Sequence, residues 1–395
     1  MGKYQSIYLL NGRDEAVRRF HPWIFSGAIK RAEKGIKEGD WVEIFSEEEK
    51  YLASGYALPG SITVKICSFS RVDPDQTWWN AKLQQAFALR CAAGLTDNPI
   101  TNCYRLVFSE GDLLPGLIID FYNGTAVIQT HAAFMHDAKL MITEALKNLY
   151  GENLKAVFDK SADTMSRNTD IEVVDSYLFG QSGTEEIVEN SLHFKANWED
   201  GQKTGFFLDQ RENRKLLQQY AKGRKVLNTF CYTGGFSIYA LSAGATLVHS
   251  VDSSAKAIAG VETNVLLNGL NDGRHQAFTI DAKRYLEEME ETYDLIILDP
   301  PAFAKHMDSR HKAIKGYTKL NKQAFEKIAP GGILFTFSCS QVVDRQQFYS
   351  AVMAAAIESG REVKVLHQLT QPADHPINIF HAEGQYLKGL VLMVY

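Results

Sequence analysis

Residues 225–237, KVLNTFCYTGGFS, decide the fold: an apolar strand from Lys225 to Phe230 runs into the paired glycines Gly234 and Gly235 and then into a helix. Paired glycines let the backbone turn sharply and approach a ligand, and the N–H groups of the following helix point to the same place. The outer glycines of the dinucleotide fingerprint G-x-G-x-x-G are missing, so the stretch taken alone also fits a plain turn.

Strands and helices alternate regularly on the carboxyl side of this stretch. Apolar runs predict strands at 246–251, 277–280, 293–298 and 332–337, and helical patterns occupy 254–268, 282–289 and 348–358. Such alternation is typical of a parallel sheet covered by helices on both faces. Ligands of these sheets bind outside the carboxyl ends of the strands, so the chemistry is expected there.

Acidic residues follow the second and third strands of this series. Asp252, followed by Ser253, suits a ribose diol, and Asp281, followed by Ala282, can accept a hydrogen bond from an adenine amino group. Either aspartate could equally cap the next helix. The glycine turn, Asp252 and Asp281 stand at three successive strand ends. A nucleoside site explains all three together, which we favour over one unrelated turn and two unrelated helix caps.

The fourth strand ends in Asp299-Pro300-Pro301-Ala302-Phe303. Two prolines remove two backbone donors and fix the chain as it leaves the sheet. A carboxylate held so rigidly contributes little to the fold. It is well suited to recognise the amino edge of a nucleobase. We therefore interpret Asp299 as a functional residue.

The fifth strand ends in Ser338-Cys339-Ser340. A cysteine near a strand is usually a small buried hydrophobe, but the fourth and fifth strands should be neighbours, which would bring Cys339 beside Asp299. A thiolate can add to C6 of a pyrimidine and make C5 nucleophilic enough to attack an electrophilic methyl group. Basic residues nearby would lower the thiol pKa, although none can be assigned from sequence.

Residues 204–214, TGFFLDQRENR, join an apolar stretch to a charged one ahead of the first strand. The simplest interpretation is the start of an amphipathic helix with Asp209 as its N-cap.

Composition excludes several classes of protein. The 395 residues carry 42 basic and 47 acidic side chains, a net charge of −5, and no apolar run approaches the ~18 residues of a membrane span. No signal peptide is recognisable, which predicts a cytoplasmic protein. The five cysteines form no C-x-x-C pair, so neither a disulfide framework nor a metal site is expected.

Basic residues gather in two places. Residues 1–37 carry eight basic and three acidic side chains, and residues 301–330 carry seven and two. Such patches on a mildly acidic protein can bind phosphates without binding every polyanion, although both could also be solvated faces.

Three domains are expected from these patterns. Residues 1–72 are β-rich, residues 73–184 form a small α+β unit that opens with a helix at 78–93, and residues 185–395 hold the regular α/β pattern.

Together these segments resemble a class I S-adenosylmethionine-dependent methyltransferase, in particular the RlmI family of bacterial 23S rRNA cytosine-C5 methyltransferases. The matching motifs are His21-Pro-Trp-Ile-Phe-Ser-Gly27, Gly111 to Asp120, Gly205 to Arg211, Tyr232 to Phe236, Asp299-Pro-Pro301 and Ser338-Cys-Ser340. The resemblance implies a multidomain α/β protein with an N-terminal β-barrel-like PUA domain that binds RNA, a central α+β domain and a C-terminal Rossmann-like methyltransferase sheet.

The resemblance also implies roles for individual residues. Cys339 would be the nucleophile and Asp299 would engage the cytosine N3/N4 edge. Asp252 and Ser253 would lie at the ribose of S-adenosylmethionine, and Asp281 and Ala282 at its adenine. The remaining cofactor-binding residues would be Asp209, Gln210, Arg211, Tyr232, Thr233, Gly234 and Gly235.

Two alternatives stay open. Relatives with similar motifs methylate guanine N7, in which case Cys339 would be structural, and a non-catalytic RNA-binding assembly factor would not bind S-adenosylmethionine. Ala302 stands where amino-directed methyltransferases carry an aromatic residue, which argues against an exocyclic amine as the target. The expected partner is 23S rRNA, with no membrane and no metal, and a homodimer is left open.

Overall fold

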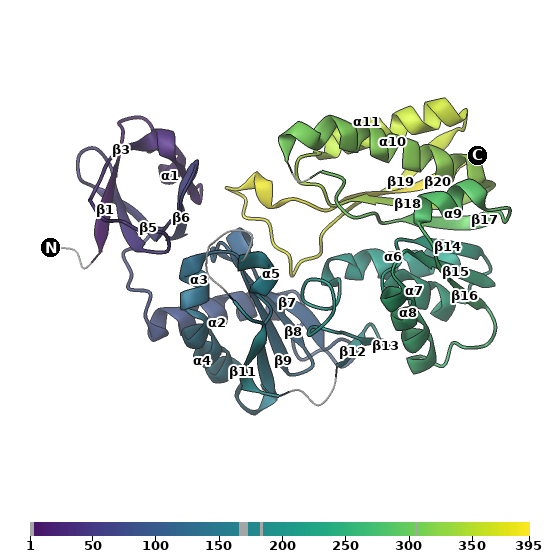
Figure 1. Ribbon diagram of the computed structural model, residues 1–395, viewed down its shortest axis with the longest axis horizontal. Helices are drawn as coiled ribbons and strands as arrows, with labels where there is room; N and C mark the ends of the chain where they lie inside the picture. Colours follow the sequence, from purple (N-terminus) through teal and green to yellow (C-terminus); the bar gives the residue numbers. More distant parts are fainter. Residues whose placement is uncertain (1–3, 166–172, 182–184, 305) are drawn as a thin grey trace. The chain divides into compact units, whose positions relative to one another are not determined.

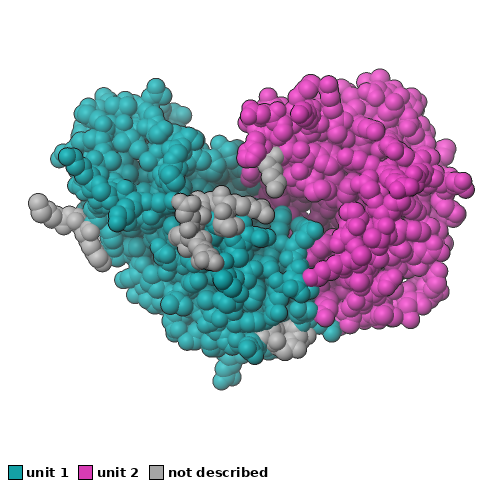
Figure 2. Space-filling view, in the orientation of Figure 1, with its two compact units in different colours: residues 1–187, 196–208, 373–384 teal, residues 188–195, 209–372, 385–395 magenta. Residues whose placement is uncertain are grey.

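The computed structural model describes residues 4–165, 173–181, 185–304 and 306–395. The chain divides into two compact units (Figure 2). The first comprises residues 1–187, 196–208 and 373–384, and the second comprises 188–195, 209–372 and 385–395. The segments 196–208 and 373–384, which the sequence assigned to the third domain, therefore pack within the first unit.

The amino-terminal part of the first unit is a six-stranded sheet in the order β2-β6-β5-β4-β1-β3. Its strands are β1 (Gln5–Leu9), β2 (Trp23–Phe25), β3 (Ile29–Ala32), β4 (Trp41–Phe45), β5 (Tyr51–Ala57) and β6 (Ile62–Ser68). Apolar side chains of these strands, such as Ile7, Val42 and Val64, form a core of their own. The expected β-rich start of the chain is confirmed.

A five-stranded sheet follows, in the order β11-β10-β9-β8-β7 (Figure 1). Its strands are β7 (Cys103–Phe108), β8 (Leu117–Tyr122), β9 (Thr125–Thr130), β10 (Ala156–Asp159) and β11 (Ser176–Gly180). Helix α2 (Gln76–Ala92) packs against α4 (Lys139–Tyr150), and Asp75 caps α2 by accepting from the Trp78 N–H. The predicted central α+β unit is thus present.

The second unit is built on a seven-stranded sheet in the order β16-β15-β14-β17-β18-β20-β19. Its strands are β14 (Lys225–Thr229), β15 (Leu247–Asp252), β16 (His275–Thr279), β17 (Tyr293–Leu298), β18 (Ile328–Ser338), β19 (Val363–Thr370) and β20 (Lys388–Val394). The first five of these in sequence pair in parallel, as predicted. Strand β20 runs antiparallel to both β18 and β19, so the sheet is mixed.

Helices cover this sheet on both sides (Figure 1). They are α6 (Arg211–Ala221), α7 (Gly235–Ser242), α8 (Ala255–Leu267), α9 (Ala282–Glu288), α10 (Arg310–Lys327) and α11 (Arg345–Ser359). Helix α10 was not predicted from the sequence because its exposed faces are so polar. Its buried residues, among them Ala313, Tyr317 and Leu320, nevertheless recur at helical spacing and pack against α11 and the sheet.

The interpretation of Asp209 as a helix cap is wrong. Helix α6 begins at Arg211, Gln210 occupies the N-cap position, and no side chain caps the helix there. None of the helices in the described ranges combines the length and hydropathy needed to cross a bilayer.

Candidate active site

The parallel register brings the predicted site residues to one edge of the sheet. Thr229 of β14 lies opposite Val251 of β15 and Leu298 of β17, and Leu298 lies opposite Thr336 of β18. The four strands therefore end side by side. The glycine loop, Asp252, Asp299 and Cys339 follow those ends directly, so the expectation that they share one edge is confirmed.

The loop between β14 and α7 has an unusual backbone. Phe230, Tyr232 and Gly234 all have positive φ angles, of 54°, 47° and 79°. A Cβ atom at Gly234 would lie 2.8 Å from Cγ1 of Val261, and one at Gly235 would lie 3.0 Å from Cδ of Arg214. Gly234 is thus required by backbone conformation and by close packing, and Gly235 by close packing, which the plain-turn interpretation also explains.

Asp252 holds this loop in place. One carboxylate oxygen accepts from the Tyr232 N–H at 3.0 Å and the other from the Ser254 N–H at 2.9 Å. Ser254, not Asp252, caps α8. A carboxylate bound to two backbone donors at a strand end is oriented for a further contact, as a ribose diol would require.

The buried hydroxyl of Thr233 tests whether the loop fits a ligand. The Thr233 carbonyl accepts from Asn264 Nδ2 at 2.8 Å, whereas its Oγ1 has no hydrogen-bond partner in the described part of the chain. Buried hydroxyl groups are almost always hydrogen-bonded. The unpartnered oxygen fits a polar ligand such as S-adenosylmethionine.

Asp281 follows β16 and is exposed. Its Oδ1 accepts from the N–H groups of Lys283 and Arg284, both at 3.0 Å, so it caps α9. Ser253 is exposed and Ala282 is buried. The adenine-side assignment of Asp281 and Ala282 remains a prediction, because the cap explains this aspartate without a ligand.

The residues ahead of α6 reach the same edge. Gln210 is buried, and its Nε2 donates to Asp299 Oδ2 at 3.0 Å while its Oε1 accepts from Asn213 Nδ2 at 2.6 Å. The Tyr386 hydroxyl donates to Asp209 Oδ2, also at 2.6 Å. Asp209 and Gln210 are thus tied to residues far away in the sequence, which a helix cap would not require.

A buried ion pair lies beneath the glycine loop. Arg214 donates from Nε and Nη2 to the two carboxylate oxygens of Glu189, both at 2.8 Å, and Arg211 Nε lies 3.6 Å from the same carboxylate. Burial alone would lower the pKa of Arg214, but Glu189 raises that pKa above its ordinary value. Sequence analysis missed Glu189 and Arg214, since nothing in their spacing links them.

Cys339 differs from the other thiols in exposure and position. It is partly exposed, whereas Cys67, Cys103 and Cys231 are buried and Cys91 is on the surface. Its Sγ lies 3.9 Å from the carbonyl oxygen of Pro300, the residue after Asp299. Burial raises the pKa of Cys67 to about 12 and raises that of Cys231, so neither is suited to nucleophilic chemistry.

Lys388 is a site residue that the sequence did not reveal. It begins β20 and pairs with Ser338, and its Nζ donates to the carbonyl oxygens of Ser340 at 2.6 Å and Tyr386 at 2.8 Å. Burial lowers the pKa of this amine to about 8. The sequence feature that could have identified Lys388 is a single charged residue at the start of an apolar strand.

Phe303 lies in the turn that follows Asp299. Its ring stacks on Tyr317 with centroids 4.6 Å apart, and Lys283 Nζ lies 5.0 Å from the ring centroid. Phe303 therefore packs against α10. That Ala302 argues against an exocyclic amine as the target stays a prediction, which the packing of Phe303 does not test.

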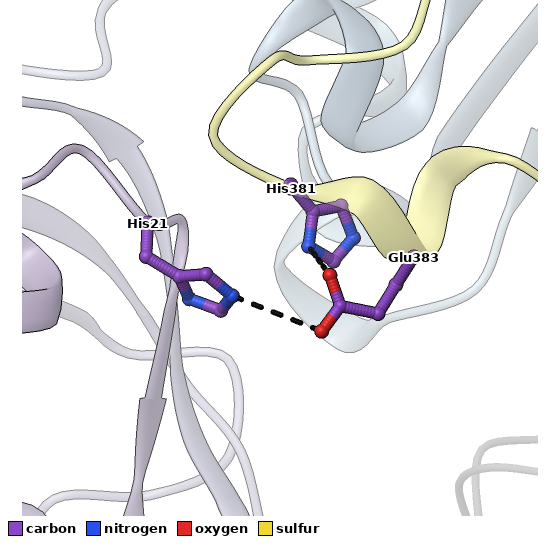
Figure 3. A group of neighbouring side chains, drawn as sticks. All are labelled: His21, His381 and Glu383. Atoms are coloured by element: carbon purple, nitrogen blue, oxygen red, sulfur yellow. Dashed lines mark ion pairs between the residues drawn. The ribbon is translucent and has the colours of Figure 1, made fainter.

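A second cluster of polar side chains belongs to the first unit (Figure 3). His381 Nδ1 lies 3.0 Å from one Glu383 oxygen, and His21 Nε2 lies 4.0 Å from the other. The ring of Trp23 packs on His381 with centroids 4.3 Å apart. Two histidines and a carboxylate could ligate a metal, but Glu383 is half exposed and these contacts are also those of an ion-paired cluster. The absence of a metal site remains a prediction.

Comparisons with known proteins agree with the geometry. A family model described as S-adenosylmethionine-dependent methyltransferase matches residues 171–383, and a PUA-like domain model matches residues 7–69. A ribosomal RNA large subunit methyltransferase I from Aeromonas hydrophila is 38% identical over 396 residues, covering 98% of both chains. A protein of the same name from Vibrio cholerae is 34% identical over 397 residues, covering 98% of this chain and 99% of the relative.

Solved structures show the same fold. A structure described as a SAM-dependent methyltransferase from Streptococcus mutans superposes with a TM-score of 0.84, covers 98% of this chain and 99% of its own, and is 24% identical. A methyltransferase solved in complex with S-adenosylhomocysteine gives the same values. The expected fold class, with a PUA-like start, a central α/β part and a seven-stranded methyltransferase sheet, is confirmed.

Proposed function

Because the chain belongs to the ribosomal RNA large subunit methyltransferase I family of S-adenosylmethionine-dependent methyltransferases, we propose that it methylates C5 of a cytosine in 23S rRNA. The target atom is inferred from the placement of Cys339 Sγ, 3.9 Å from the carbonyl oxygen of Pro300, the residue after Asp299. Cytosine C5 is too weak a nucleophile without covalent activation, and a partly exposed cysteine at the turn that carries Asp299 can supply that activation.

Each group of the site has a part in this reaction. Asp299, oriented by Gln210, accepts a hydrogen bond from the cytosine amino group. The Cys339 thiolate adds to C6, so that an S–C6 bond forms and the C5–C6 π electrons move to C5. S-adenosylmethionine, when bound, supplies an electrophilic methyl group. Loss of the C5 proton and departure of the thiolate then restore the aromatic ring.

The residues that would hold S-adenosylmethionine surround the glycine loop. Thr233, Gly234 and Gly235 would line its methionine end, and Asp252 would accept from the ribose hydroxyls. Ser253, Asp281 and Ala282 would lie towards the adenine, and Asp209, Gln210, Arg211 and Tyr232 would complete the enclosure. The unpartnered Thr233 oxygen supports this assignment.

The protein would bind the RNA through its phosphate groups. At the start of α10, Arg310, Lys312 and Lys315 form no ion pair with any described residue, and they follow the Asp299 turn closely in the chain. Many cations of residues 1–37 are instead paired, as Lys30 is with Glu47 and Arg31 with Glu49. We therefore assign the stronger phosphate contact to α10, and the PUA-like domain, residues 1–72, to further RNA contacts in the cytoplasm.

The test combines a deletion strain with covalent trapping. Mass spectrometry of rRNA nucleosides should show one 5-methylcytosine missing from the deletion strain and restored by the wild-type gene but not by Cys339→Ala. Active enzyme should also form a covalent complex with RNA containing 5-fluorocytosine, because fluorine at C5 cannot leave as a proton. If Cys339→Ala restores the modification, the covalent mechanism is wrong and a guanine N7 target becomes the better explanation.

A further inference from the structure

Lys388 is held against the turn that carries the proposed nucleophile. Its side chain is buried, and Nζ donates to the carbonyls of Ser340 and Tyr386. Ser338, its partner across the sheet, and Ser340 flank Cys339 on either side. A buried lysine is costly unless its charge is used or compensated, and no carboxylate within ion-pair distance compensates it in the described ranges.

The surroundings of Lys388 shift the pKa of its amine in opposite directions. Burial lowers its pKa to about 8, a Cys339 thiolate acts in the opposite direction, and Arg345 and Asp344 at the start of α11 have weaker, opposed effects. Tyr317, which hydrogen-bonds to Ser340 Oγ, stays neutral because burial raises its pKa. An ammonium ion has three N–H donors, and the two carbonyls accept from it.

We propose that Lys388 activates Cys339: its ammonium ion, held at the carbonyl of the adjacent Ser340, favours the thiolate electrostatically. The thiol proton passes to solvent at this partly exposed residue, and the sulfur electron pair becomes available to form the S–C6 bond. Lys388 is thus a positioning and activating residue that acts through Cys339. The inference rests on the covalent role of Cys339 proposed above and answers how that thiol is ionised at neutral pH.

Alkylation of the full-length protein by iodoacetamide tests this without RNA. Peptide mass spectrometry gives the rate at Cys339 between pH 5.5 and 9.5, with the exposed Cys91 as an internal reference. Lys388→Met should slow Cys339 alkylation about tenfold at pH 7 and move its pH profile upwards by about one pH unit, since a neighbouring cation favours the thiolate by at least that much. The matched control, Lys364→Met, removes an exposed lysine of the adjacent strand β19 and should change neither.

A second variant separates charge from packing. Lys388→Met leaves two buried carbonyls without a donor and could unfold the protein, which thermal denaturation would reveal. Lys388→Arg keeps the positive charge, so Cys339 should remain reactive below pH 7. In the wild-type protein, Cys339 should react at lower pH than Cys91, and coincident pH profiles of the two thiols would overturn the role of Lys388.

The outcomes for Lys388 and for the proposed function are distinguishable. An unchanged alkylation profile in folded Lys388→Met, with methylation abolished in Cys339→Ala, rejects the role of Lys388 and leaves cytosine methylation standing. Retained methylation in Cys339→Ala rejects the proposed function, whatever the alkylation rates are.

Discussion

The side-chain amide of Gln210 donates a 3.0 Å hydrogen bond to Oδ2 of Asp299, although 89 positions separate the two residues. The same amide accepts from Asn213, which sets its orientation so that Nε2 points towards the carboxylate. The segment before α6 therefore orients the residue that we propose recognises the cytosine.

Changing Gln210 to glutamate should impair methylation more than folding. The substitution places a second carboxylate beside Asp299, removes the hydrogen-bond donor and adds like-charge repulsion. We expect kcat/KM for methyl transfer to fall by about tenfold or more, equivalent to about 1.4 kcal/mol of transition-state stabilisation. Gln219→Glu, on the exposed face of α6, is the control and should retain wild-type rates. Equal kcat/KM values in both variants would show that Asp299 does not need the hydrogen bond from Gln210 for methyl transfer.

Substitution of Gly234 should weaken binding of S-adenosylmethionine. An alanine would adopt a φ near +79° at a cost of about 1–2 kcal/mol, and its Cβ would lie 2.8 Å from Val261 Cγ1. Gly269→Ala is the matched control, since φ is +63° there and no atom lies within 4 Å. Calorimetry should show at least about tenfold weaker binding for Gly234→Ala only, because 1.4 kcal/mol is tenfold in affinity. If the double variant Gly234→Ala/Val261→Ala recovers part of the affinity for S-adenosylmethionine, the clash with Val261 accounts for that part of the loss.

Breaking the buried ion pair should destabilise the protein strongly. Arg214→Met leaves the Glu189 carboxylate buried without its bidentate partner, and we expect the free energy of unfolding to fall by about 3–5 kcal/mol. Arg284→Met breaks the exposed pair with Glu288 and should cost under about 1 kcal/mol. Denaturant unfolding measures both, and similar losses would mean that the buried pair is not the larger contribution.

His275 should make the second unit sensitive to acid. Burial, and then the nearby His249, lower the pKa of His275 to about 4, while its Nε2 hydrogen-bonds with Ser250 Oγ at 2.8 Å. Because the folded-state pKa lies below the unfolded value of about 6.5, the unfolded chain takes up the proton first and stability falls as the pH drops from about 6.5 to 4.

The loss between pH 6.5 and 4.5 should be on the order of 2 kcal/mol. His275→Gln, which cannot titrate, should lose less over this range, as urea denaturation at each pH will show. His311→Gln on the exposed surface of α10 should behave like the wild type. If the free energy of unfolding of His275→Gln falls with pH as steeply as that of the wild type, other groups cause the acid sensitivity.

Local sequence predicted the elements far better than the contacts between them. Strand β17 was predicted with its observed bounds, Tyr293–Leu298, because an apolar run bounded by turn residues is a local signal. The broad order of domains followed from the same patterns. Helix α10 was missed because its apolar stripe is interrupted by many charges, and only packing against α11 and the sheet makes that stripe visible.

The sequence by itself determined which residue types stand at the strand ends, and so the glycine loop, Asp252, Asp299 and Cys339 could all be named. Their relation to Gln210, Glu189, Arg214 and Lys388 was decided only by the tertiary structure. The reason is physical: a strand end is defined by neighbours along the chain, whereas a buried hydrogen bond or ion pair depends on which segments the sheet brings together. Lys388 lies opposite Ser338, the residue before Cys339, because β20 enters the sheet antiparallel to β18, and no local pattern specifies that pairing.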